Sequence, residues 1–310
     1  HTRGMFQTGA DSRNQQEDLL TGRGLKPLRQ GAPKARFGLG LLSAVLKQHG
    51  HDARLHYMFG KLDLAPLRRV MAEYRPDIVG FQLVYPQFHY VQRILREMKP
   101  WPAFVIAGGP HPTVQPEACI TELPELDAIC LGEGEGALLE LAEALRDGAS
   151  PEAIRNLWVR RADGAIVRNP LRPFIQDLDT LPFMDREICD YQAVIDSDFK
   201  IATFQFGRGC PYDSSYCSNH IIRSSQKGTY VRYRSVELSL EEIRRVVDRY
   251  EVKTIYSNDD TFLANKAWYE EFCDKYPKRF DLPLQVNARP EQINEDVCRR
   301  LAAAGCNRVT

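Results

Sequence analysis

The first half of the sequence alternates between amphipathic segments and short apolar runs. Apolar positions three or four residues apart predict helices over 37–50, 64–74, 91–98 and 137–148. Apolar runs of strand length lie at 53–57, 77–84, 103–109 and 127–135. Continuous apolar strands that alternate with helices are typical of a parallel sheet covered on both faces. We therefore expect a doubly wound parallel-sheet, Rossmann-like α/β domain.

The same alternation returns in the second half. The pattern predicts strands over 201–209, 253–259 and 282–290, and helices over 237–251, 266–276 and 295–305. Residues 307–310 begin another strand. Successive strand–helix units of about 40 residues predict the first part of a parallel β/α barrel, with ligands at the carboxyl ends of its strands. Because the sequence starts with His1 and stops where a strand begins, we expect a fragment with a truncated barrel.

Three segments follow from this pattern. We place the first domain over residues 1–150, of which 1–36 are poorly patterned and show no evident first strand. Residues 151–190 break the alternation with a hairpin over 157–169 and a proline-rich stretch, so we interpret them as a connector. Residues 191–310 are then the amino-terminal part of the barrel.

Composition narrows the possible partners and the compartment. The 41 Lys and Arg residues balance the 41 Asp and Glu residues, which gives no support for nucleic acid as a partner. No long apolar run exists and the N-terminal stretch lacks an apolar signal core, so we expect no transmembrane segment and a cytoplasmic location. Six of the eight cysteines are scattered singly, which is typical of buried free thiols in a reducing compartment.

Cys210 and Cys217 differ from the other cysteines because they share a short loop after a predicted strand. The loop reads GRGCPYDSSYCSNH over 207–220. It resembles the C-x3-C-x2-C signature of radical S-adenosylmethionine (SAM) enzymes, with Ser214 at the middle position. The SNDDTF segment at 257–262 resembles the radical SAM subgroup that carries an N-terminal cobalamin-binding domain. The upstream segments DIVGFQLV, IAGGPHPT and DAICLGEGE resemble strand ends of that domain.

The resemblance implies a [4Fe–4S] cluster and bound SAM in the second domain. In the family three thiolates hold the cluster, so Cys210 and Cys217 are the expected ligands and Ser214 marks the missing one. The expected SAM contacts are Tyr216, Asn258, Asp259, Asp260, Asn287 and Arg289. A solvated acidic turn at 259–260, ordinary loop roles at 287 and 289, and simple packing at 216 remain open as alternatives.

For the first domain the resemblance implies bound cobalamin. The expected contacts lie at the strand ends: Gln82, Gly108, Gly109, His111, Gly132 and Glu133. Paired glycines would let a flat corrin ring approach the backbone closely. The D-x-H-x-x-G loop that supplies a cobalt ligand in many cobalamin proteins is absent. We therefore expect His111 to cap the chain or contact the nucleotide tail rather than bind cobalt.

The implied activity is reductive cleavage of SAM to a 5′-deoxyadenosyl radical, followed by methyl transfer to an unactivated carbon or its rearrangement. The expected substrate is a small molecule or a peptide, and the expected reductant is a flavodoxin or ferredoxin. Two alternatives stay open. Ser214 could leave a cluster-deficient, non-catalytic cobalamin-binding protein, or the first domain could no longer use cobalamin.

Overall fold

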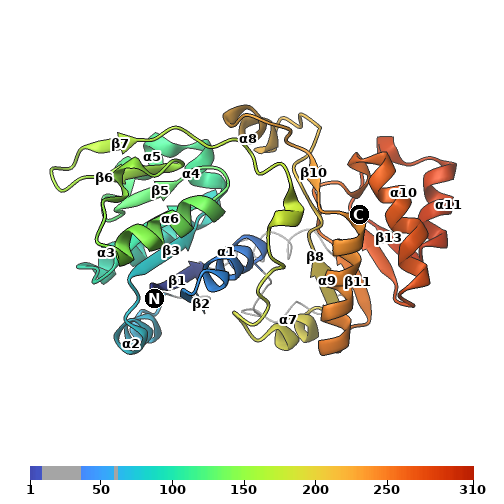
Figure 1. Cartoon of the computed structure of the whole chain (residues 1–310), viewed down its shortest axis with the longest axis horizontal. Helices are drawn as coiled ribbons and strands as arrows, with labels where there is room; N and C mark the ends of the chain where they lie inside the picture. The colour runs from blue at the N-terminus through green and yellow to red at the C-terminus, as the bar shows by residue number, and fades with distance from the viewer. Residues whose placement is uncertain (9–35, 59–61) are drawn as a thin grey trace. The chain divides into compact units, whose positions relative to one another are not determined.

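The computed structural model describes residues 1–8, 36–58 and 62–310, which form two compact units (Figure 1). The first unit contains residues 1–173, with 184–189 and 224–227 packed into it. The second unit contains residues 174–183, 190–223 and 228–310.

The first unit is built on a seven-stranded sheet in the order β2-β1-β3-β4-β5-β6-β7. Five strands are parallel: β1 (Arg3–Thr8), β2 (Asp52–Tyr57), β3 (Ile78–Gln82), β4 (Phe104–Gly108) and β5 (Ala128–Cys130). Strands β6 (Leu157–Arg160) and β7 (Ile166–Arg168) continue the sheet in antiparallel fashion. The predicted hairpin at 157–169 therefore forms, and it belongs to this sheet.

Helices cover both faces of that sheet, as expected for a doubly wound domain. Their bounds are α1 (Phe37–Gln48), α2 (Ala65–Tyr74), α3 (Phe88–Met98), α4 (Pro110–Val114), α5 (Pro116–Glu122) and α6 (Glu135–Arg146). One apolar core contains buried residues of α2, α3 and α5, and a second contains buried residues of α1 and α6. The predicted parallel sheet with two covered faces is confirmed.

Strand β1 was not evident in the sequence. It is the second strand of the sheet, hydrogen-bonded to the edge strand β2 on one side and to β3 on the other. Its adjacent residues Met5 and Phe6 are 0% and 2% exposed and enter opposite cores. Two apolar residues next to Gly4 and Gln7 are too short a signal to predict a strand, so tertiary pairing defines this element.

The second unit contains four adjacent parallel strands in the order β13-β12-β11-β8. These are β8 (Ile201–Phe204), β11 (Thr254–Ser257), β12 (Leu284–Val286) and β13 (Cys306–Val309), and successive strands are linked by α9 (Val236–Arg249), α10 (Lys266–Lys275) and α11 (Glu295–Ala303). This is the predicted succession of barrel units. Short elements that lie wholly or partly in this unit include α7 (Tyr191–Ser197), α8 (Asn219–Ser225), and the antiparallel pair β9 (Gly207–Arg208) and β10 (Arg232–Tyr233).

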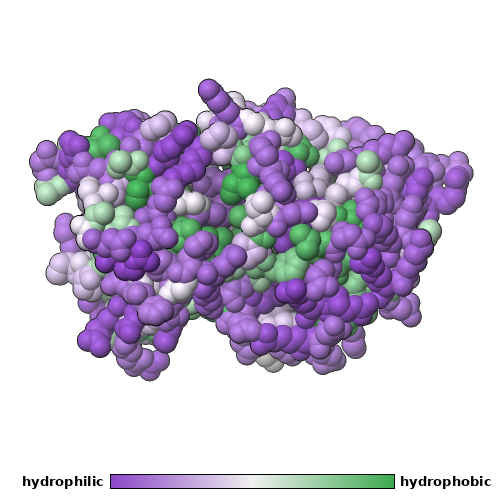
Figure 2. Space-filling model, in the orientation of Figure 1, coloured by the Kyte–Doolittle hydropathy of each residue, from purple (hydrophilic) through white to green (hydrophobic). Residues whose placement is uncertain are grey.

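The surface of the described residues is largely polar, and Figure 2 shows one mostly hydrophilic face. Their exposed large apolar side chains are few: Tyr85, Phe199, Tyr216, Ile221, Ile293 and Val309. Within 1–8, 36–58 and 62–310, no helix combines the length and the hydropathy that a bilayer crossing requires. Tyr85 and Tyr216 stand out because each follows a strand end that was singled out in the sequence.

Candidate functional site

The cysteine loop of the second unit starts from a tightly packed backbone. A Cβ atom on Gly207 would lie 2.7 Å from the Tyr233 ring, and one on Gly209 would lie 2.5 Å from the Tyr230 carbonyl oxygen. Gly209 also has φ +88°, a conformation that glycine adopts without strain. The glycines of the GRGC segment therefore allow β9 and β10 to pair closely where the loop begins.

The loop brings its two cysteines and the serine between them into one turn. Cys210, Ser214 and Cys217 are partly buried, and the Cys217 amide donates to the Ser214 carbonyl at 3.0 Å. Burial raises the pKa of the Cys210 thiol. The Ser214 hydroxyl accepts a hydrogen bond from Nη1 of Arg289 at 3.1 Å. Ser214 and Arg289 are 75 residues apart in sequence, so the fold brings the end of β12 to the cysteine loop.

Arg289 is held by three neighbours. Besides Ser214, its guanidinium lies 4.3 Å from the centroid of the Tyr212 ring and forms an ion pair with Glu291 at 3.2 Å. The side chain therefore lies over the loop with its charge partly neutralised.

The donor set does not match a three-thiolate cluster site. Cys210 and Cys217 supply two thiols, and Ser214 supplies a hydroxyl that is much less acidic than a thiol. Within the described part of the chain, no three His, Cys, Asp or Glu side chains are grouped as a metal site requires. As it stands, the loop lacks one ligand for a [4Fe–4S] cluster.

The two aspartates after β11 have different environments. The Asp259 side chain is 2% exposed, and its carboxylate accepts from the Gly207 amide at 2.7 Å and from the Ser257 hydroxyl at 2.6 Å. Burial raises the pKa of Asp259 to about 7. Asp260 is exposed, and one of its carboxylate oxygens accepts from Asn219 at 3.1 Å.

The neighbouring asparagines also differ. Asn258 is exposed, and its backbone N–H donates to the Phe204 carbonyl at 2.7 Å. The Asn287 side chain is engaged at both ends: Nδ2 donates to the Asp259 carbonyl at 3.0 Å, and Oδ1 accepts from the Tyr256 hydroxyl at 3.0 Å. Asn287 thus joins the ends of β11 and β12.

Tyr216 projects from the cysteine loop. Its side chain is 93% exposed, so it makes little contact with the protein core.

Tyr230 and Asn219 were not singled out in the sequence, although the Tyr230 hydroxyl donates to Asn219 and Asn219 donates to Asp260. Only their place after the signature could have pointed to them.

In the first unit, the Gly-Gly turn after β4 is linked to the end of β5. Gly109 has φ +106°, and a Cβ atom there would lie 3.1 Å from the Leu83 carbonyl oxygen. The Thr113 hydroxyl donates to the Gly109 carbonyl and accepts from the Gly132 amide, both at 2.9 Å. Thr113, which sequence reasoning missed, therefore fixes the two glycine turns to one another.

Gly108 and Gly109 are not equivalent. A Cβ atom on Gly108 would meet only Cys130 at an ordinary 3.6 Å, and the residue is partly exposed. At position 109 the backbone conformation itself favours glycine, whereas the glycine at position 108 leaves open space at the carboxyl end of β4. Of the two, Gly108 is the position where the absence of a side chain could serve a ligand.

Gln82 and His111 lie at the same edge of the sheet. The Gln82 Oε1 atom is buried and has no hydrogen-bond partner among the described residues. The His111 ring is 9% exposed and packs against Phe88 and Tyr85, with centroid distances of 5.0 and 5.7 Å. Burial lowers the pKa of His111, so its ring is neutral at neutral pH. An unsatisfied buried amide oxygen is costly unless a ligand or water supplies a donor.

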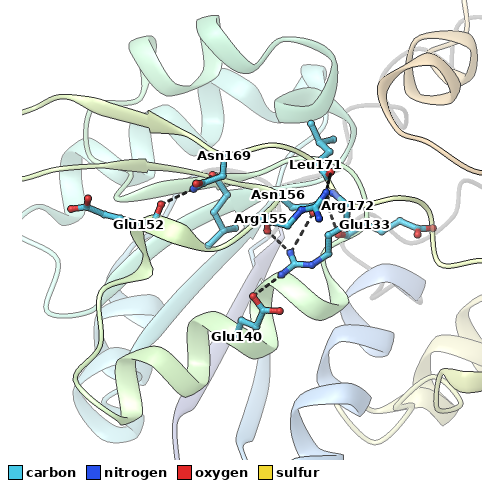
Figure 3. Close-up of polar contacts among 9 residues, drawn as sticks. Glu133, Glu140, Glu152, Arg155, Asn156, Asn169, Leu171 and Arg172 are labelled. Carbon is cyan, nitrogen blue, oxygen red and sulfur yellow. Dashed lines mark hydrogen bonds and ion pairs between the residues drawn. The ribbon is translucent and has the colours of Figure 1, made fainter.

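The Gly132–Glu133 turn is held by a buried asparagine (Figure 3). Asn156 is fully buried, and its Nδ2 donates to the carbonyls of Leu131 at 2.7 Å and Glu133 at 3.4 Å. Its Oδ1 accepts from the Arg172 amide at 2.9 Å. The Gln226 side chain fills the space beside Gly132, where a Cβ atom would lie 2.3 Å from Gln226 Oε1.

Two family models match the chain. The model of the B12 binding domain matches residues 35–142, and the model of the Radical SAM superfamily matches residues 204–310. The chain belongs to the radical SAM proteins that carry a B12-binding domain. The resemblance seen in the cysteine loop and in the strand ends is thereby confirmed. The first unit contains the B12-binding domain, and the second contains the radical SAM domain.

Relatives among curated proteins include methyltransferases and cyclases. A protein named as an uncharacterized methyltransferase from Pyrococcus horikoshii is 28% identical over 88% of this chain and 59% of its own length. The anaerobic magnesium-protoporphyrin IX monomethyl ester cyclase of Rubrivivax gelatinosus is 28% identical over 74% of this chain and 42% of its own length. The chain thus spans about half the length of these relatives.

Solved structures share the fold over the whole chain. The radical S-adenosylmethionine methyltransferase TsrM from Kitasatospora setae, solved with tryptophan substrate and the SAM analog aza-SAM, matches with a TM-score of 0.72. The identity is 19%, and the match covers 100% of this chain and 58% of TsrM. At that identity the likeness establishes the fold.

Proposed function

We propose that this chain is the cofactor-binding part of a cobalamin-dependent radical SAM enzyme. The activity proposed for the complete protein is methyl transfer to, or rearrangement of, an unactivated carbon in a small molecule or peptide. The observation that carries this proposal is the cysteine loop, which is tied to the Asp259–Asp260 turn at the carboxyl ends of the barrel strands. A cytoplasmic location and a flavodoxin or ferredoxin donor belong to the same proposal.

The residues around the cysteine loop offer the contacts that SAM requires. Asp260 is exposed and keeps one carboxylate oxygen for the methionine ammonium, which carboxylates bind by charge-assisted hydrogen bonds. Tyr216 presents a free ring on which an adenine could stack. Asn258 and Arg289 are further polar groups beside the same strand ends, whereas the Asn287 amide is already engaged within the protein.

The carboxyl ends of β3 and β4 in the first unit offer groups that fit cobalamin. When bound, cobalamin supplies a cobalt centre that can carry a methyl group. Gly108 leaves room for a flat ring at the backbone, and the unpaired Gln82 oxygen can accept from a corrin amide group. The His111 ring packs between Tyr85 and Phe88, and we propose that it contacts the cofactor without binding cobalt.

The cluster is the exception. Two thiols and the Ser214 hydroxyl, already bound by Arg289, are a poor site for four irons, so we derive no step through a cluster in this chain. This observation favours a second candidate function, that of a cobalamin-binding protein that does not cleave SAM.

Cobalamin titration tests the assignment of the first unit. We expect hydroxocobalamin to bind the chain and Gly108→Leu to weaken its affinity by at least about tenfold, because the leucine would occupy the bare strand edge. Ala149→Leu adds the same side chain at an exposed position after α6 and should bind like the parent. Electron paramagnetic resonance of the Co(II) form should show no splitting from a histidine nitrogen.

Two outcomes would contradict the assignment. Unchanged cobalamin affinity in a folded Gly108→Leu variant would remove the proposed site from this strand edge. No cobalamin binding by the parent chain would reject cobalamin as its cofactor. Thermal unfolding of both leucine variants shows whether the fold is intact.

A further inference from the structure

The buried carboxylate of Asp259 joins two strand ends. It accepts from the backbone amide of Gly207, the first residue of β9, and from the hydroxyl of Ser257, the last residue of β11. Gly207 comes three residues before Cys210. The start of the cysteine loop is therefore bonded to the end of the next barrel strand through one side chain.

A second link runs parallel to the first. The Tyr233 ring lies over Gly207, where a Cβ atom would be 2.7 Å away, and its hydroxyl donates to the Thr261 carbonyl at 2.7 Å. Thr261 follows the aspartate pair directly. Two contacts, one through Asp259 and one through Tyr233, thus hold the turn after β11 against the start of the cysteine loop.

Asp260 is placed at the other end of the loop. Its carboxylate accepts from Asn219, two residues after Cys217, and Asn219 accepts from the Tyr230 hydroxyl. Asp260 is exposed, whereas Asp259 is 2% exposed with both carboxylate oxygens bonded inside the protein. A positively charged ligand that arrives from solvent can reach the Asp260 carboxylate but not the Asp259 carboxylate.

We propose that the two adjacent aspartates have separate roles. Asp259 is a positioning residue that fixes the start of the cysteine loop, and the SAM ammonium contact proposed above belongs to Asp260 alone. The inference rests on the proposed function for its SAM half. Its loop half rests only on the contacts of Asp259.

Paired substitutions by asparagine separate the two roles. In Asp259→Asn the amide oxygen can still accept from Gly207, and the amide nitrogen can donate to the Ser257 hydroxyl. These two hydrogen bonds can therefore persist, so we expect the SAM dissociation constant to change less than about threefold and the Gly207 amide to exchange no faster than in the parent. In Asp260→Asn the loss of charge should weaken SAM binding at least about tenfold and leave Gly207 exchange unchanged.

Removal of the acceptor should release the loop. Asp259→Ala leaves the Gly207 amide without its partner, so its exchange should accelerate by roughly tenfold or more. Ser257→Ala removes only the second hydrogen bond and serves if the first variant does not fold; its Gly207 exchange should rise by a smaller factor. SAM itself is the ligand in the titrations.

The outcomes decide between the roles. Weak SAM binding in Asp259→Asn, equal to that in Asp260→Asn, would show that Asp259 binds the ammonium. Parental Gly207 exchange in Asp259→Ala would show that it does not hold the loop. If the parent chain binds no SAM, the SAM part of the proposed function fails, while the exchange rates of Asp259→Ala and Asp259→Asn still decide the positioning role.

Discussion

At the scale of single residues, the buried carboxylate of Asp259 makes the stability of the folded chain depend on pH. Burial raises the pKa of Asp259 to about 7 in the folded chain, above the ordinary aspartate value of about 4 in the unfolded chain. The folded state therefore binds this proton more tightly. The stability from this group is fully present below pH 4 and is lost as the pH rises through 7.

Asp259→Asn should remove this pH dependence. The amide mimics the neutral acid, so we expect the variant to match the parent near pH 4 and to exceed its free energy of unfolding at pH 8, by up to about 4 kcal/mol. Urea denaturation at the two pH values measures the difference. Equal slopes of stability against pH in parent and variant would show that Asp259 titrates normally.

At the scale of elements, Asn156 fixes the turn after β5. It is fully buried, has φ +72°, and bonds to Leu131, Glu133 and Arg172 through its side chain. Figure 3 shows Asn156 beside Glu133 and Arg172. Asn156→Ala would leave buried backbone groups without partners and place alanine in a left-handed conformation. We expect a loss of about 2–4 kcal/mol in unfolding free energy and weaker cobalamin binding.

Asn169→Ala is the matched control in the same hairpin. Asn169 is only partly buried, and its Nδ2 donates to the Glu152 and Leu157 carbonyls at 2.8 Å. We expect a loss of about 1 kcal/mol with cobalamin affinity unchanged. Equal losses of affinity in the two variants would mean that the Gly132–Glu133 turn has no special part in binding.

The sequence predicted some of these elements well and others poorly, for physical reasons. Long periodic segments such as α9, and the apolar strands β3 and β4, can be predicted from the spacing of apolar residues alone. Helices α4 and α5 begin at Pro110 and Pro116 and were not predicted, since proline is tolerated in the first helical turn but otherwise signals a break. Strand β1 required its partners β2 and β3.

The candidate site shows the same limit. The signature located the cysteine loop and the aspartate pair, because residue types at fixed spacing carry that information. The directions of Asp259 and Asp260 depend on how the chain leaves β11, which no local pattern encodes. Asn156, Thr113 and Asn219 resemble ordinary loop residues, and only their burial or their partners mark them.

At the scale of the molecule, the chain combines the two domains of its family, and its cysteine loop has Ser214 at the middle position of the three-cysteine signature. The surroundings of Ser214 remain those of a cluster loop: Cys210, Cys217, Tyr216 and the aspartate turn are all in place. We therefore propose that this loop is a cluster site which lacks one thiolate.

Iron and sulfide content after anaerobic reconstitution tests that claim most directly. We expect the parent chain to retain a labile, substoichiometric cluster, and Ser214→Cys to contain about four irons and about four sulfides per chain. Ser215→Cys adds a thiol one residue away, outside the signature spacing, and should behave like the parent. A full, stable cluster in the parent, or no gain of iron in Ser214→Cys over Ser215→Cys, would contradict the account.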